Sequence, residues 1–223
     1  FSVAAKLHAL WGLGQLGENG QVERVSPIIL TALTNADVEI RANAARVAGT
    51  IPLQSSIPVL VDLLEDQSPR VVSLAAVSLG GIVSKGDEEV VGAIFEAVSR
   101  NIGSKFDVVL RHAHLSALDR LATVEQILAR AQSDSVEERL VSVLALRRRA
   151  DGNLITFLND PSPLVRMESI RAIYDTSALD GLAGKKLAET DPVEYPLYIQ
   201  YRIAGANFRL GTVSYTHLRA HET

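Results

Sequence analysis

The 223-residue sequence contains no cysteine, one tryptophan and one methionine, and only 5% of its residues are aromatic. Without cysteine the chain can form neither disulfides nor thiolate metal sites, and this absence leaves the cellular compartment undecided. Long apolar runs are also missing. The longest runs, such as residues 141–146, fall far below the roughly 18 residues that a membrane-spanning helix needs. We therefore expect no transmembrane span.

An excess of positive charge is missing as well, since the formal net charge is −4. A protein that binds nucleic acid normally shows a basic face. The one basic cluster is Arg147, Arg148 and Arg149, at the end of an expected helix, where the helix dipole favours cations. We interpret this cluster as a solvated helix end, with contact to an anion or an acidic partner as the alternative. No nucleic-acid partner is expected.

What the sequence does contain is one helical pattern written six times. Each copy has an anchor residue, a usually small residue three places later and an apolar residue seven places later. A supersecondary unit that recurs every 27 to 39 residues is typical of helix pairs stacked into a solenoid. The anchors are Lys6, Arg41, Val72, Arg111, Arg139 and Arg166.

Apolar stretches between the anchored helices predict the partner helix of each pair. In residues 57–64 the apolar side chains have helical spacing, and Pro58 falls in the first turn, where a missing N–H costs least. The sequence therefore predicts an all-α fold, an α-solenoid of stacked antiparallel helix pairs with about six to seven units. The expected partner helices span 22–34, 56–65, 88–102, 124–131, 153–158 and 178–189.

Turn residues separate these helices. Gly14, Gly49 and Gly80 directly follow the apolar residue in the first three copies, and we expect them at helix ends, where a C-terminal turn often needs a positive φ. Asp66-Gln-Ser-Pro69 and Asp160-Pro-Ser-Pro163 are expected to end one helix and open the next, because proline is disfavoured inside a helix.

The segment Asp160-Pro-Ser-Pro-Leu-Val-Arg166 shows the pattern most clearly, and it resembles the HEAT repeats in the bacterial form found in phycobilisome lyases. The resemblance covers about residues 1–175. In such repeats the acidic turn residue and the arginine commonly interact between neighbouring units. The resemblance implies a ladder that is interrupted at Val72. Its pairs would be Asp37 with Arg41, Asp107 with Arg111, Asp134 with Arg139, and Asp160 with Arg166.

Several stretches, among them 7–14, 109–113, 138–148 and 206–211, resemble the HEAT segment of large exported proteins from planctomycetes and their relatives. Those proteins join a sugar-dehydrogenase-like β-propeller, HEAT repeats and a cytochrome c module with a CxxCH haem motif. The resemblance implies a periplasmic or exported location. Because this chain has neither propeller nor cysteine, we expect haem c and any redox chemistry to belong to modules outside it.

The two ends are those expected of a fragment, with residues 1–211 forming the repeat domain. Phe1 lies inside what reads as the second helix of a pair. Residues 212–223 show no helical periodicity and resemble the translation of a sequencing-library adapter. We treat them as a non-native or disordered tail, as one treats an expression scar.

No residue pattern predicts a catalytic, cofactor-binding or metal site. His112 and His114 lie two apart on an expected helix and so point to different faces. Gly12 and Gly14 belong to a helix instead of following a strand, as the glycines of a phosphate loop would. His8, three residues before Trp11, is placed to stack on that ring.

Tyrosines gather past the regular repeats, with Tyr195, Tyr198 and Tyr201 at three-residue spacing. Plain packing is the first interpretation, because aromatic side chains dominate cores. The alternative is a surface that docks the next domain, since aromatics are enriched at interfaces.

These observations predict a non-catalytic scaffold for protein–protein or inter-domain interaction within a larger, redox-associated bacterial protein. Its expected partners are proteins or neighbouring domains of the same chain. A free-standing HEAT-like accessory or lyase-type subunit is the alternative, and a nucleic-acid-binding HEAT protein is the weaker one. The fold alone does not choose among them, because it serves many unrelated partners.

Overall fold

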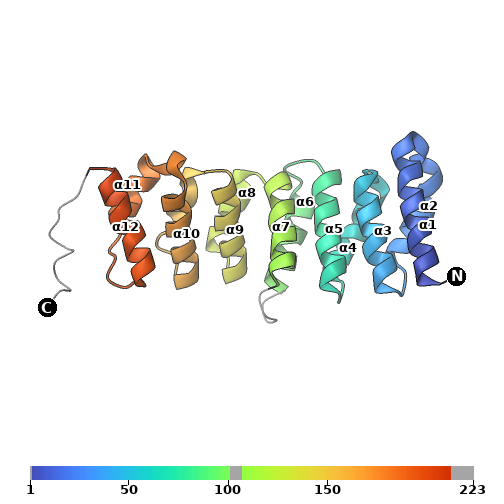
Figure 1. The fold of residues 1–223 in the computed structure, drawn as a ribbon, viewed down its shortest axis with the longest axis horizontal. Coiled ribbons are helices and arrows are strands. Elements are labelled where there is room, and N and C mark those ends of the chain that lie inside the picture. The colour runs from blue at the N-terminus through green and yellow to red at the C-terminus, as the bar shows by residue number, and fades with distance from the viewer. Residues whose placement is uncertain (1, 101–106, 212–223) are drawn as a thin grey trace. The chain divides into compact units, whose positions relative to one another are not determined.

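The computed structural model describes residues 2–100 and 107–211, and the regular elements in these ranges are all helical (Figure 1). The chain divides into two compact units, Phe1–Gln126 and Ile127–Thr223. Within the described ranges no helix is both long enough and apolar enough to cross a bilayer. The expected tail, residues 212–223, lies outside the described residues. The predicted all-α fold is confirmed.

The first unit contains a row of anchored helices in which each packs against the next: α1 (Val3–Leu16), α3 (Val38–Thr50), α5 (Pro69–Ile82) and α7 (Val108–Leu121). Each partner helix packs against the anchored helix that follows it, and together the partners form a second layer behind the row (Figure 1). The partners are α2 (Val22–Leu33), α4 (Ile57–Asp62) with the 3-10 turn η3 (Leu63–Glu65), and α6 (Glu88–Arg100). The short turns η1 (Gly17–Gln21) and η2 (Gln54–Ser56) precede α2 and α4.

The second unit repeats the arrangement with shorter partner elements. Its anchored helices α9 (Val136–Arg148) and α10 (Pro163–Asp175) pack together, and α10 also packs on α12 (Leu197–Arg209). The expected partner helix at 153–158 is a 3-10 helix. The partner elements are α8 (Val124–Ala129), which begins in the first unit, η4 (Arg130–Gln132), η5 (Gly152–Phe157), η6 (Ser177–Leu179) and α11 (Leu182–Ala188).

Helix starts follow the chemistry of the sequence. Asp37 and Asp107 cap α3 and α7, because each carboxylate accepts hydrogen bonds from the backbone N–H groups two and three residues later. Pro69 and Pro163 open α5 and α10, where the missing N–H has no intrahelical partner to lose. The sequence therefore fixes these helix starts locally.

The expected role of Gly14, Gly49 and Gly80 at helix ends is wrong, because all three lie inside their helices. A positive φ occurs instead at glycines such as Gly20 and Gly86. The three helical glycines are points of close approach between neighbouring anchored helices: Gly14 faces Val47, Gly49 faces Ser78 and Gly80 faces Ala117. A Cβ atom at Gly49 would overlap the neighbouring helix, and one at Gly14 or Gly80 would crowd it more mildly.

We expect Gly49→Ala to lower the free energy of unfolding by about 2 kcal/mol. A Cβ atom on Gly49 would lie 2.7 Å from Ser78 Cβ and 2.9 Å from Ser78 Cα, and the latter is backbone that cannot rotate away. Overpacking costs about 1–3 kcal/mol, which outweighs alanine's helix propensity advantage of about 1 kcal/mol. Urea unfolding followed by circular dichroism measures the change.

Gly12→Ala is the matched control, because Gly12 lies in α1 with nothing within 4 Å of its added Cβ. Helix propensity then acts alone and should stabilise the protein by about 0.5–1 kcal/mol. If both substitutions changed stability in the same direction, close helix approach would not be the reason for glycine at position 49.

Candidate interaction site

Two of the anchor arginines, Arg41 and Arg139, tie successive repeats together. In the first unit Arg41 Nε donates to Asp66 Oδ2 at 2.8 Å and Nη2 donates to Oδ1 at 3.0 Å, a bidentate pair from α3 to the turn before α5. Arg41 Nη1 also donates to the carbonyl of Asn35 at 2.8 Å. This geometry holds the turns before two consecutive anchored helices at a fixed distance.

The charge pair changes the proton affinities of both groups. Burial alone would raise the pKa of Asp66, but hydrogen bonds from Arg41 and from the N–H of Ser68 outweigh burial and lower it. The hydrogen bond to Asp66 raises the pKa of Arg41, against the opposing effect of desolvation. Both groups are therefore held in their charged forms at neutral pH.

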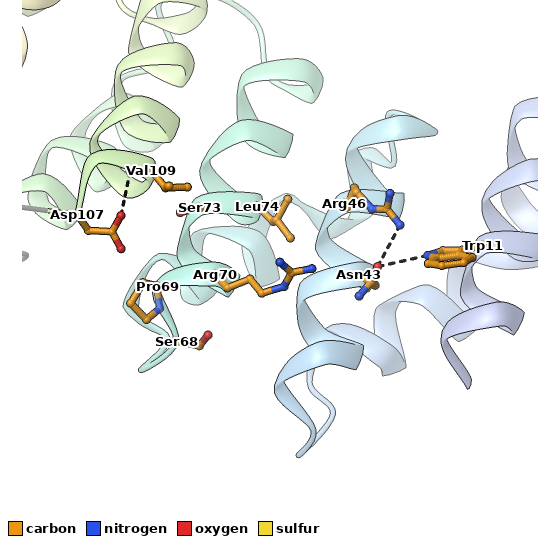
Figure 2. A pocket seen from close by; sticks show the side chains of 10 residues that line it. All are labelled: Trp11, Asn43, Arg46, Ser68, Pro69, Arg70, Ser73, Leu74, Asp107 and Val109. Atoms are coloured by element: carbon orange, nitrogen blue, oxygen red, sulfur yellow. Dashed lines mark hydrogen bonds between the residues drawn. The ribbon is translucent and has the colours of Figure 1, made fainter. Parts of the chain in front are cut away.

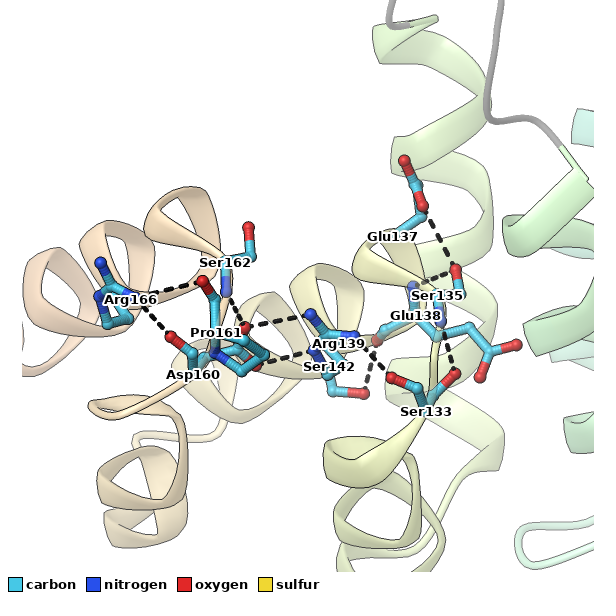
Figure 3. Close-up of polar contacts among 10 residues, drawn as sticks. All are labelled: Ser133, Ser135, Glu137, Glu138, Arg139, Ser142, Asp160, Pro161, Ser162 and Arg166. Carbon is cyan, nitrogen blue, oxygen red and sulfur yellow. Dashed lines mark hydrogen bonds and ion pairs between the residues drawn. The ribbon is translucent and has the colours of Figure 1, made fainter.

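The second unit contains the same clamp in more buried form (Figure 3). Arg139 Nε donates to Asp160 Oδ2 at 2.8 Å and Nη2 to Oδ1 at 3.2 Å, while Nη1 donates to the carbonyl of Ser133. Asp160 Oδ1 also accepts from the N–H of Ser162 at 2.8 Å, and its backbone carbonyl accepts from Arg166 Nη1 at 2.7 Å. Asp160 thus joins α9 to α10.

The expected ladder pairs need correction, because Arg41 and Arg139 pair with the aspartate of the following repeat. Asp37 caps α3 instead of pairing with Arg41 through its side chain, and Asp134 is exposed beside Ser135, which caps α9. Arg166 contacts the backbone carbonyl of Asp160, not its carboxylate.

The remaining expected pair, Asp107 with Arg111, lies at the start of α7, where the N–H of Arg111 donates to the backbone carbonyl of Asp107 at 3.0 Å. Val72 is buried at the anchor position of α5 and its side chain has no hydrogen-bond donor, so the arginine clamp has no counterpart at that position. Asp66 was missed as a ladder residue, although it stands three residues before a helix-opening proline just as Asp160 does.

A groove of about 680 Å³ crosses the anchored helices of the first unit (Figure 2). Trp11 comes from α1, Asn43 and Arg46 from α3, and Leu74 from α5. Val109 of α7 lies beyond Leu74 in Figure 2. The groove is further lined by Ser68, Pro69, Arg70, Ser73 and Asp107.

Asn43 organises the α1 end of the groove from a buried position. Its Oδ1 accepts from Trp11 Nε1 at 3.3 Å and from Arg46 Nη2 at 3.0 Å, and its Nδ2 donates to the carbonyl of Glu39 at 2.8 Å. The Arg46 guanidinium lies 5.8 Å from the centre of the Trp11 ring, within the range of a cation–π contact. One buried amide therefore orients an exposed indole and an exposed guanidinium.

His8 extends this aromatic end of the groove. Its ring centroid lies 5.3 Å from that of Trp11, with the planes tilted by 32°, so the expected contact between these rings is confirmed. The indole nevertheless keeps 47% of its surface exposed.

The basic cluster of the second unit is partly engaged within the protein. Arg147 Nη1 pairs with Glu168 at 3.0 Å and Nη2 approaches Asp175 at 3.8 Å. Arg148 is the last residue of α9, and Arg149 follows it as the C-terminal cap. Arg147 therefore fastens α9 to α10, which reduces its charge available to a partner.

The tyrosines of the second unit fall into two environments. The Arg166 guanidinium lies 5.9 Å from the Tyr195 ring centre, and Tyr195 is half-buried. Tyr198 donates to Met167 Sδ at 3.6 Å and stays half exposed, and Tyr201 is 63% exposed on α12. Tyr198 and Tyr201 are therefore the exposed members of the predicted tyrosine group, and the interaction surface of this unit stays a prediction.

His112 is exposed on α7, whereas His114 is almost completely buried, so the two imidazoles occupy different faces as expected. Burial lowers the pKa of His114 to about 4. Over residues 2–100 and 107–211, no group of three or more His, Cys, Asp or Glu side chains is arranged to hold a metal ion.

We expect the protein to lose about 2 kcal/mol of stability between pH 7 and pH 5 through His114. In the unfolded chain the His114 imidazole binds a proton below about pH 6.5, whereas in the folded chain it stays neutral down to about pH 4. Between these two pH values, proton binding therefore favours the unfolded state. Urea unfolding at several pH values measures how the free energy of unfolding changes with pH. His114→Leu should remove this part of the slope, and an unchanged slope in that variant would contradict the assignment.

Two overlapping stretches of the chain, residues 2–80 and 25–101, match the family model described as HEAT repeats. Together with the stacked helix pairs, this match confirms the predicted fold class, an α-solenoid of HEAT-like repeats. No curated protein matches the chain. The narrower resemblance to exported dehydrogenase and cytochrome proteins stays a prediction.

Proposed function

We propose that this chain is a non-catalytic repeat scaffold whose first unit binds a protein partner along the groove across α1, α3, α5 and α7. The observation that carries this proposal is the groove itself, to which four successive anchored helices contribute. HEAT repeats support it, because solenoids offer extended surfaces made by successive repeats.

The lining has the composition of a protein-binding surface. Trp11, Leu74 and Val109 supply apolar area, and the first and last of these are 47% and 70% exposed. Tryptophan and arginine are the residues that most often dominate binding energy at interfaces. Arg46 and Asn43 stand next to the indole, so apolar and hydrogen-bonding groups meet at one place.

The wider setting that we propose is a larger redox-associated bacterial protein, in which the scaffold connects modules. This part rests on the sequence resemblance alone. Haem, if the whole protein contains it, would belong to a CxxCH module outside the chain, and the partner of the groove would be a protein or another domain.

The test is selection of octapeptides from a random display library on the immobilised chain. We expect selected peptides to bind Trp11→Ala at least about 10-fold more weakly, because truncating a tryptophan that dominates an interface commonly costs more than about 1.4 kcal/mol. Ile28→Ala is the matched control, because Ile28 is also an exposed apolar residue but lies on α2, behind the groove.

Peptides that bind the wild type and Ile28→Ala equally, and Trp11→Ala weakly, support the proposal. A selection that yields no binders, or binders indifferent to Trp11, would overturn it. Circular dichroism of each variant verifies that the helices remain formed.

A further inference from the structure

The charge distribution of the groove identifies the kind of peptide that it would hold, and this step rests on the function proposed above. Its lining contains the cations Arg46 and Arg70 and a single carboxylate, Asp107. Asp107 is occupied as the cap of α7, because its Oδ1 accepts from the N–H groups of Val109 and Leu110 at 2.9 and 3.0 Å. Apart from this capping carboxylate, the charged side chains of the lining are two arginines, although the whole chain has a net charge of −4.

Arg46 is the stronger of the two anion-binding candidates. Its guanidinium is positioned by Asn43 and the Trp11 ring, both neutral, and among the described residues no carboxylate lies within ion-pair distance of it. A guanidinium presents five donors in a planar fork that matches a carboxylate. Here the fork is oriented and its charge is uncompensated, so an incoming carboxylate displaces no protein anion.

Arg70 is paired only weakly. Its Nε lies 3.3 Å from Glu39 Oε1, and both side chains are about half exposed, at 58% and 48%. An exposed pair of this kind contributes little to stability. A ligand carboxylate can therefore replace Glu39 at small cost, which makes Arg70 available from the opposite side of the groove.

The length of the groove fits an extended peptide. Packed helices have axes about 8–10 Å apart, so the row from α1 to α7 spans about 24–30 Å. An extended chain rises about 3.3 Å per residue, and about eight residues cover this distance. Leu74 and Val109 provide apolar contacts at the far end from Trp11 (Figure 2).

We propose that the groove binds an extended peptide of about eight residues in which an Asp or Glu carboxylate contacts Arg46 and Arg70, with apolar side chains against Trp11 on one side and Leu74 and Val109 on the other. Nucleic acid is disfavoured, because two arginines offer few contacts to a phosphate backbone.

The test uses two synthetic octapeptide pools that are identical except at the two central positions, which are Asp or Glu in one pool and Asn or Gln in the other. Flanking positions carry Leu, Val or Phe in both. Trp11 is the only tryptophan of the chain, so its emission reports binding at the groove directly. We expect the acidic pool to bind about 10-fold or more tightly than the amide pool at low salt, as expected for a charged hydrogen bond.

Arg46→Gln and Arg70→Gln should each reduce this preference, and the double variant should abolish it. Arg24→Gln is the charge-matched control, since Arg24 is exposed on α2 and hydrogen-bonds only to Gln21 among the described residues. An equal loss in Arg24→Gln would mean unspecific attraction and would overturn the inference, as would tighter binding of a single-stranded oligonucleotide than of the acidic pool.

The outcomes separate the two proposals. Binding of both pools with equal affinity, sensitive to Trp11→Ala, keeps the scaffold function and refutes the acidic preference. Failure of both pools to change the emission of Trp11, together with no binders from the random library, refutes both.

Discussion

Asp160→Ala is expected to destabilise the second unit by about 3–5 kcal/mol, the usual cost of removing one partner of a buried ion pair. Asp160 and Arg139 are both buried, and their bidentate pair is formed at 2.8 and 3.2 Å. The substitution leaves the Arg139 charge without a carboxylate and the N–H of Ser162 without its acceptor. Hydrogen exchange of the α9 and α10 amides measures the loss for this unit alone.

Asp134→Ala is the control, because Asp134 is the turn residue that the HEAT resemblance paired with Arg139 and the structure leaves exposed. Its replacement should change stability by less than about 0.5 kcal/mol, as is usual for surface sites. A larger loss for Asp134→Ala than for Asp160→Ala would restore the original pairing. Replacing both Arg139 and Asp160 by leucine should cost much less than Asp160→Ala, since no charge remains buried.

Leu79→Ala is expected to lower the free energy of unfolding by about 3.5–5 kcal/mol, because the deleted atoms leave a cavity among packed helices. The Leu79 side chain is completely buried in α5. Urea unfolding followed through the fluorescence of Trp11 reports on the same unit.

Val77→Ala is the matched control on the same helix, since Val77 keeps 43% of its surface exposed. We expect it to change stability by less than about 0.5 kcal/mol. Equal stability of the two variants would show that the repeat register assigned to α5 is wrong.

The repeat register was predictable from sequence because the core positions recur at fixed offsets from each anchor. Ala44, Ala75, Leu79 and Leu118 all lie at such offsets, and all are fully buried. Ala9 is exposed although it has the same offset, because α1 is the first helix of its row. Offsets predict which face of a helix is apolar, whereas neighbours decide whether that face is buried.

The glycines and the ladder pairs were misassigned for a common reason. Gly49 and Asp66 act on residues of another repeat, Ser78 and Arg41, so their roles depend on how two helices are placed side by side. A local interpretation assigned the glycine to a helix end and paired each arginine with the nearest aspartate. The sequence of a single repeat does not show how close the next repeat will lie.

The groove was also missed, although a signal for it exists. Several residues two or five places after the anchors line it in the first copies: Trp11 in α1, Asn43 and Arg46 in α3, and Leu74 in α5. The sequence pattern drew attention to the buried offsets, three and seven places after the anchor. Comparing the exposed offsets between copies would have brought Trp11 and Arg46 together.

Val72 has a mechanical consequence for the first unit. Between α3 and α5, the bidentate hydrogen bonds of Arg41 resist rotation, because they weaken steeply when their angles change. Val72 supplies no such bond between α5 and α7, whose contacts include apolar packing that has no preferred direction. We therefore expect Val72 to contribute packing but no directional restraint at the anchor position of α5, whereas Arg41 contributes two directional hydrogen bonds at the anchor position of α3.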